Sequence, residues 1–129
     1  MVLTAKMSEL AMKVSGSAMH ERGLIRLDVK VSNDGEVPLE ALRLKARYNK
    51  SDLASKDSDK AKLHHLLPGD YFSQTFLLRP RVSIDETILG IKVRAEKAGV
   101  RLAVDLDLGS MSINVKGLPY EGGDPIPRM

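Results

Sequence analysis

The sequence predicts one all-β domain, an antiparallel sandwich or barrel of about seven short strands. Apolar and polar residues alternate with a period of two along most of the chain, and clusters of Gly, Pro, Asn and Asp separate the alternating runs. We find no run with the apolar period of an amphipathic helix. A chain of 129 residues is the size of a single domain with a single core. We place this domain at residues 1–116 and expect residues 117–129, rich in Pro and Gly, to form an extended tail.

Two strands are predicted in the N-terminal part of the chain. The first is expected at 7–18, where an alternating apolar run ends at Ala18, and the second is expected at 24–32. A glycine inside a strand is typical of a bulge or of a close backbone approach, and we expect one of these at Gly16.

The segment NDGEVPLEA, residues 33–41, joins the second strand to the third either as a hairpin or as a crossing between two sheets. Asn-Gly and Asp-Gly hairpins connect their strands through two residues, and this connection is much longer. Pro38 also cannot donate a hydrogen bond to a strand ladder. We therefore predict an arch that crosses between the sheets, with a local turn at its Asp-Gly pair and with Val37 and Leu39 capping the end of the core.

The middle of the chain combines strands with a polar loop. We expect a strand at 41–49, a mobile loop at 50–62, a short strand piece near Leu63 to Leu66, and a strand at 70–78 after the turn LPGD. The side chains of this last strand that we expect to face the core are Phe72, Phe76 and Leu78.

The last two strands, at 87–96 and 100–115, are predicted to form a hairpin. With a two-residue turn at Ala98-Gly99, four apolar pairs face the core. These pairs are Ala95 with Leu102, Val93 with Val104, Ile91 with Leu106, and Leu89 with Leu108. The same register sets Glu96 against Arg101 and Lys92 against Asp105 on the outer face. After Leu108 the apolar residues change parity, which predicts a bulge at Gly109-Ser110.

The composition excludes several classes of function. Cysteine is absent, which rules out disulfides, thiol nucleophiles and thiolate metal sites. No apolar run approaches the roughly 18–20 residues of a membrane helix, and the N-terminal segment lacks the apolar core of a signal peptide. We therefore expect a cytoplasmic protein if the chain is complete, and a cell-envelope or secreted one if it is an excised domain. The total of four Asn and Gln residues favours a heat-loving source.

No residue pattern predicts catalysis, a cofactor or a bound metal. Adjacent strand residues point to opposite faces, so His64 and His65 cannot chelate one ion from a strand. The loop 50–62 lacks the Gly and Glu of a calcium-binding hand at the positions counted from Asp57, although a cation site built from several segments stays open. The paired carboxylates of the last strand are expected to form ion pairs on an exposed sheet. We expect no enzyme activity.

Three stretches resemble a known family. They are VKVSNDGEVPLEALRLKARYN, LLPGDYFSQTFLLRP and TILGIKVRAEK, within residues 24–108. Their turns and the spacing of the final hairpin resemble the bacterial and archaeal cell-adhesion-related domain and its fibronectin type III-like neighbours. The resemblance implies an immunoglobulin-like β-sandwich, a prokaryotic source, and a non-catalytic role in adhesion, spacing or protein binding.

The packing that this resemblance implies defines two candidate binding surfaces. The strands at 41–49 and 87–96 become neighbours, so five cations share one outer face that would attract an acidic protein, a nucleic-acid backbone or anionic lipid. These cations are Arg43, Lys45, Arg47, Lys92 and Arg94. The second surface is the edge segment 109–116, which would present an apolar row beside free backbone donors and so invite strand addition by a partner or a second copy. The row consists of Met111, Ile113 and Val115.

We therefore expect a non-enzymatic protein-interaction or structural module of the adhesion or assembly type, whose partner is another protein or a second copy of the chain. The alternative is binding of nucleic acid or of an acidic partner through the cationic face. The net charge is only +3 and aromatic residues make up 4% of the chain, which disfavours nucleic acid.

Overall fold

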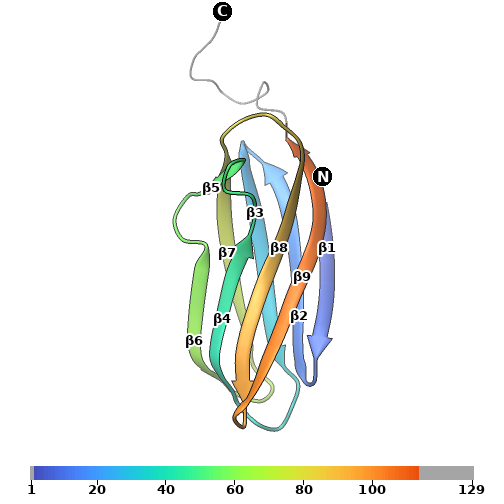
Figure 1. The fold of residues 1–129 in the computed structure, drawn as a ribbon. Coiled ribbons are helices and arrows are strands. Elements are labelled where there is room, and N and C mark those ends of the chain that lie inside the picture. The colour runs from blue at the N-terminus through green and yellow to red at the C-terminus, as the bar shows by residue number, and fades with distance from the viewer. Residues whose placement is uncertain (1, 114–129) are drawn as a thin grey trace, which may run out of the picture.

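A computed structural model of the chain describes residues 2–113, and the predicted all-β sandwich is confirmed (Figure 1). The described residues form nine strands in two antiparallel sheets that pack face to face. In chain order the strands are β1 (Val2–Glu9), β2 (Met12–Glu21), β3 (Leu24–Asn33), β4 (Leu39–Arg47), β5 (Leu53–Ser55), β6 (Lys60–Leu66), β7 (Tyr71–Pro80), β8 (Ile84–Lys97) and β9 (Val100–Ile113). One sheet has the order β1-β2-β3-β7-β5 and the other has the order β6-β4-β8-β9. The proposed domain boundary at residue 116 and the tail at 117–129 lie outside the described residues.

The core lies between the two sheets, because each strand turns its apolar side chains inward at every second position. Phe76 and Leu78 of β7 are fully buried as predicted, and Phe72 packs against the core while partly exposed. Burying one large apolar side chain contributes about 1.5–3 kcal/mol, so this interface supplies most of the driving force for folding.

The predicted first strand at 7–18 is wrong, because the chain turns back on itself within it. β1 and β2 form a hairpin in which Glu9 pairs with Met12. Leu10 in the turn has a φ of 52°, a left-handed conformation that usually requires Gly or Asn. The sequence therefore carries no turn signal at this point. At Gly16, where a bulge or a close backbone approach was expected, the close approach is made by a side chain, since a Cβ there would lie 2.9 Å from Cδ2 of Leu106 in the opposite sheet.

The predicted mobile loop at 50–62 also contains strands. β5 pairs with β7, and β6 begins at Lys60 and pairs with β4. β5 and the second strand of the N-terminal hairpin account for the difference between nine described strands and the expected seven or so, since β6 contains the strand piece expected near Leu63 to Leu66.

The crossing arch is confirmed, because β3 and β4 belong to different sheets. Leu39 is fully buried at the end of the core, but Val37 is 38% exposed and does not cap it. Asn33 closes the arch instead. Its buried side-chain Nδ2 donates to the carbonyl oxygens of Val37 and Leu66, both at 2.9 Å.

The final hairpin has the predicted two-residue turn, with positive φ at Ala98 and Gly99. Three of the four expected apolar pairs are confirmed, and the fourth is wrong because Leu89 pairs with Gly109. The ladder shifts between Leu89 and Gly90, so the bulge lies at Leu108, just before the predicted Gly109-Ser110. The three confirmed pairs are Ala95 with Leu102, Val93 with Val104, and Ile91 with Leu106.

Candidate binding face on the four-stranded sheet

Two rows of cations cross the outer face of the four-stranded sheet. In one row, Lys45 of β4 lies opposite Lys60 of β6 on one side and Lys92 of β8 on the other. In the next row, Arg43 lies between Lys62 and Arg94 in the same way. Directly opposite residues in a sheet have Cβ atoms about 4.5–5.5 Å apart, so these side chains form one compact patch. We call it the basic face, and its members are Arg43, Lys45, Lys60, Lys62, Lys92 and Arg94.

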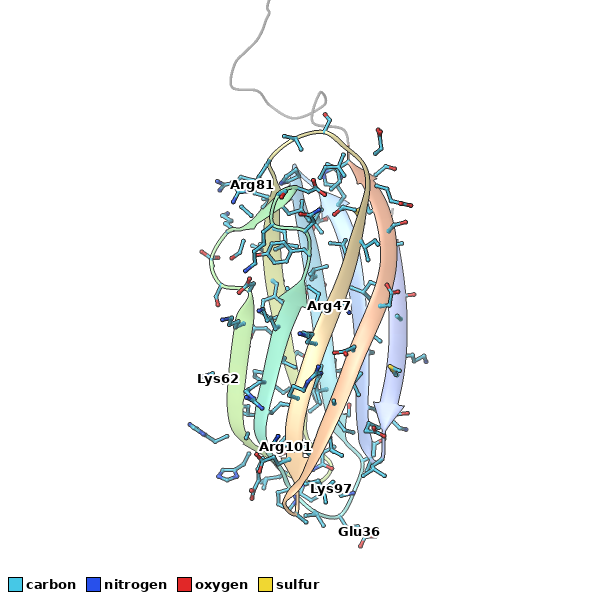
Figure 2. All side chains as sticks on the ribbon, viewed as in Figure 1. Glu36, Arg47, Lys62, Arg81, Lys97 and Arg101 are labelled. Atoms are coloured by element: carbon cyan, nitrogen blue, oxygen red, sulfur yellow. The ribbon has the colours of Figure 1, made fainter. Side chains whose placement is uncertain are left out.

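The strand pattern explains why these side chains share one face. Along β4 the residues between the cations are buried in the core, so period two turns every cation outward. Ala41 has a φ of 51° at a register shift before this run, and the shift sets the phase of the residues that follow. Arg47 continues the run beyond the two rows, opposite Gly90 of β8 (Figure 2).

The structure brings together the cations that the sequence placed on the neighbouring strands, and it adds two more. Lys60 and Lys62 fall within the predicted mobile loop at 50–62, so the sequence prediction does not include them in this face. The signal that could have found them is the alternation in KAKLHHL, in which Ala61 and Leu63 pack against the core. Figure 2 shows Lys62 projecting from β6 at the margin of the sheet.

Most of the positive charge on this face is not neutralised by the protein. Across residues 2–113, Arg94 is the one member of the basic face with an ion-pair partner, and its guanidinium lies 2.9 Å from Oδ1 of Asp105. The same guanidinium donates to the carbonyl oxygen of Val93 at 2.9 Å, which holds it flat against the sheet. The hydrogen bond and the charge of Arg94 lower the pKa of Asp105. Lys92 lies opposite Asp105 as predicted, but the expected ion pair between them is wrong because Arg94 takes that carboxylate.

The surface between the rows is hollowed rather than flat. The cations of both rows, Arg101 of β9 and one acidic residue, Glu96 of β8, line an open depression of about 900 Å³. Ala103 lies opposite Arg94, where a larger residue would fill the depression. The cations of this face could therefore form charge-assisted hydrogen bonds with the acidic side chains of an extended chain, and the depression could receive that chain.

The second predicted surface, the edge segment 109–116, is not an exposed apolar row. β9 does lie at the edge of its sheet, but Met111 and Ile113 are each only 2% exposed and face the core. The bulge at Leu108 reverses the facing of the residues after it and returns this row to the interior. Val115 lies outside the described residues. In addition, β1 of the other sheet runs alongside β9 (Figure 1).

The described part of the chain shows neither a cluster of metal-binding side chains nor a membrane-spanning helix. Between residues 2 and 113, no three or more His, Asp or Glu side chains gather in a way that would hold a metal ion. In the same range there is no helix of the length and apolar character needed to cross a membrane.

Comparison with solved structures shows the fold to be an immunoglobulin-like β-sandwich. The GAE domain of GGA2p from Saccharomyces cerevisiae aligns over 86% of this chain and 96% of that chain, with a TM-score of 0.57 and 12% sequence identity. At this identity the likeness concerns the fold alone. A second structure, the Northeast Structural Genomics Consortium target SoR45, aligns over 94% of this chain and 89% of that chain, with a TM-score of 0.39 and 10% identity.

No protein-family profile and no curated protein matches the sequence. The immunoglobulin-like fold implied by the sequence resemblance is thus confirmed, whereas membership in the cell-adhesion-related family has no support from these comparisons.

Proposed function

We propose that this domain is a non-enzymatic binding module whose basic face binds an acidic segment of another protein. The observation that carries the proposal is the row in which Lys45 lies directly between Lys60 and Lys92 with no acidic neighbour within ion-pair distance among residues 2–113. Like charges directly opposite each other destabilise a sheet. An acidic partner would remove this repulsion and form charge-assisted hydrogen bonds.

The outer face of the other sheet supports this interpretation by contrast. There Arg26 forms ion pairs with Asp28 at 3.0 Å and with Glu21 at 3.6 Å. Thr75 of the neighbouring strand donates to the same Asp28 at 2.6 Å. The charges of Arg26, Asp28 and Glu21 are therefore balanced locally, as is typical of a surface that only contacts water. The basic face lacks this balance.

A protein partner fits the basic face better than single-stranded nucleic acid does. Such nucleic acid is bound through cations together with exposed aromatic rings on which bases stack. Among the described residues, Phe72 and Phe76 pack on the core and Tyr71 lies on the other sheet beneath Lys30. Tyr48 also packs against the core and donates its hydroxyl to Asp59 at 2.9 Å. No described aromatic ring is therefore left to stack on a base between the two rows.

The test is binding of a fluorescently labelled oligoglutamate peptide to the full chain, followed by anisotropy. We expect affinity to fall steeply with added salt, and to fall about tenfold in the double variant Lys45→Gln/Lys92→Gln, which removes two charged contacts. The matched control is Lys6→Gln/Arg79→Gln, which removes the same charge from exposed positions of the other sheet and is expected to bind as the unaltered protein does. Circular dichroism checks that each variant is folded.

Two results would contradict the proposal. One is equal affinity of the Lys45→Gln/Lys92→Gln protein and the unaltered protein for the peptide. The other is binding of a short oligothymidylate more tightly than the peptide at the same salt concentration, which would favour the nucleic-acid alternative.

A further inference from the structure

The edges of the two sheets are not equivalent. The edge strands are β1 and β5 in one sheet and β6 and β9 in the other. β1 and β9 run alongside each other and close one side of the sandwich (Figure 1). On the opposite side β5 has only three residues, whereas β6 has seven and pairs with β4 without a register shift. β6 is therefore the longer edge of this side, although Ala41 and His64 are left out of its pairing with β4. It also forms the margin of the basic face.

The hydrogen bonds around β6 show which of its backbone groups point away from β4. The N–H of Ala46 donates to the carbonyl oxygen of Asp59 at 2.9 Å, which extends the β4–β6 ladder by one pair. Hydrogen-bonded pairs alternate along an antiparallel ladder, so Ala61 and Leu63 bond to β4 in the same way. The N–H and C=O groups of the residues between them point outward, and these residues are Lys60, Lys62, His64 and Leu66.

Two side-chain contacts agree with this assignment and close the two ends of the edge. The hydroxyl of Ser58 donates to the carbonyl oxygen of Lys60 at 3.1 Å and accepts from its N–H at 3.2 Å. At the other end, Asn33 donates to the carbonyl oxygen of Leu66. Between these contacts, the outward N–H and C=O groups of Lys62 and His64 have no partner in residues 2–113. An open stretch of strand edge therefore remains at the centre of β6.

We propose that the acidic segment binds as an extended strand along β6, hydrogen-bonded to the backbone of Lys62 and His64, and becomes the fifth strand of this sheet. This inference rests on the proposed function, because it states how the acidic partner is held. Side chains alternate between the two faces of a strand. Acidic residues at every second position of the added strand would lie beside Lys60 and Lys62, in line with the two cationic rows. The residues between them would lie over the half-buried Ala61 and Leu63, where small or apolar side chains fit.

The charge of β6 selects an acidic strand over a second copy of this chain. A self-paired β6 edge would set Lys60 and Lys62 against the same residues of the other copy, and lysine on an edge strand is a common protection against such pairing. The same lysines would form cross-strand pairs with Glu or Asp on an added strand.

The experiment compares three peptides of alternating Glu and Val on the full chain. One is unmodified, the second is N-methylated at each Glu and the third is N-methylated at each Val. All three have the same charge, but in a strand the N–H groups of the two residue types point to opposite edges, so only one type bonds to β6. We expect one methylated peptide to lose at least about tenfold in affinity and the other to bind nearly as the unmodified peptide does.

Two variants of the protein test the same hydrogen bonds by changing β6 instead of the peptide. Lys62→Gln removes the charge alone, whereas Lys62→Pro also removes the outward N–H without removing a bond to β4, as proline is tolerated on edge strands. Both variants are checked for folding by circular dichroism, and we expect the proline variant to bind the unmodified peptide more weakly than the glutamine variant.

Equal affinities of the two methylated peptides would overturn strand addition, since a strand has two distinct edges. That result leaves the proposed function standing if Lys45→Gln/Lys92→Gln still weakens binding. Failure of the unmodified peptide to bind where oligoglutamate binds would also overturn strand addition. Failure of both peptides to bind, or binding that is insensitive to Lys45→Gln/Lys92→Gln, would instead overturn the proposed function itself.

Discussion

Asn33 is the residue on which the local geometry of one end of the sandwich depends. Its side-chain Oδ1 accepts from the N–H of Gly35 at 3.0 Å, while Nδ2 bonds to the arch and to the end of β6. Its backbone N–H donates to Asp70 at 3.0 Å, and its carbonyl oxygen accepts from Gly69 at 2.8 Å. One fully buried polar residue thus joins β3, the arch, β6 and the turn before β7. A hydrophobic residue at this position would leave the buried carbonyl oxygen of Leu66 and two partly buried backbone groups of the arch without these partners.

We expect Asn33→Ala to lower the free energy of unfolding by about 1–3 kcal/mol, the usual cost of leaving buried hydrogen-bonding groups without a partner. Urea denaturation followed by circular dichroism measures this change. The control is Asn49→Ala, because the side chain of Asn49 accepts one hydrogen bond, from the N–H of Ser51 at 2.9 Å, at an exposed position. Equal losses in the two variants would show that the side chain of Asn33 does not hold the arch.

At the scale of the element, β4 combines a structural role with the binding role that we propose. Its inward residues fill the core, and its outward residues place cations between those of β6 and β8. The two roles are separated by side-chain direction, so the outer face can change without disturbing the core. The repulsion across the strands should then appear as a measurable loss of stability.

We expect Lys45→Glu to raise the free energy of unfolding by about 0.5–1 kcal/mol while weakening the binding of oligoglutamate more than Lys45→Gln does. The reason is that a glutamate at this position lies opposite Lys60 and Lys92 and replaces two repulsive cross-strand pairs with two attractive ones. Chemical denaturation at low salt measures the stability, and Lys45→Gln should fall between the two charged forms. A glutamate variant less stable than the glutamine variant would contradict the electrostatic description of this face.

For the whole molecule, the distribution of charge between the two sheets matters more than the small net charge. On one outer face Arg26 is paired with two acidic neighbours, whereas the other face has two rows of cations of which only Arg94 is paired in the described part of the chain. The apolar residues that the sequence suggested for self-association, Met111 and Ile113, are buried. The β6 edge carries lysines that would repel a second copy.

We therefore expect the chain to remain monomeric in solution. Light scattering across a concentration series, at low and at high salt, measures the molar mass. A dimer that persists at both salt concentrations would contradict this expectation. It would indicate a contact surface other than the basic face, with the edge strands β1 and β9 as the candidates.

The sequence alone predicts whatever depends on local alternation and on turn chemistry. The all-β class, the inward face of β3, the crossing after Asn33 and the register of the final hairpin all follow from period two and from residues such as Gly99 that permit positive φ.

What only the tertiary structure decided depends on contacts between distant segments. The turn at Leu10 has no glycine and β5 is too short to show a period, so both owe their conformation to the strands beside them. The same reason applies to the candidate site. Lys60 and Lys62 join the basic face, and Arg94 rather than Lys92 binds Asp105, because the pairing of β6, β4, β8 and β9 places residues far apart in the chain on one surface.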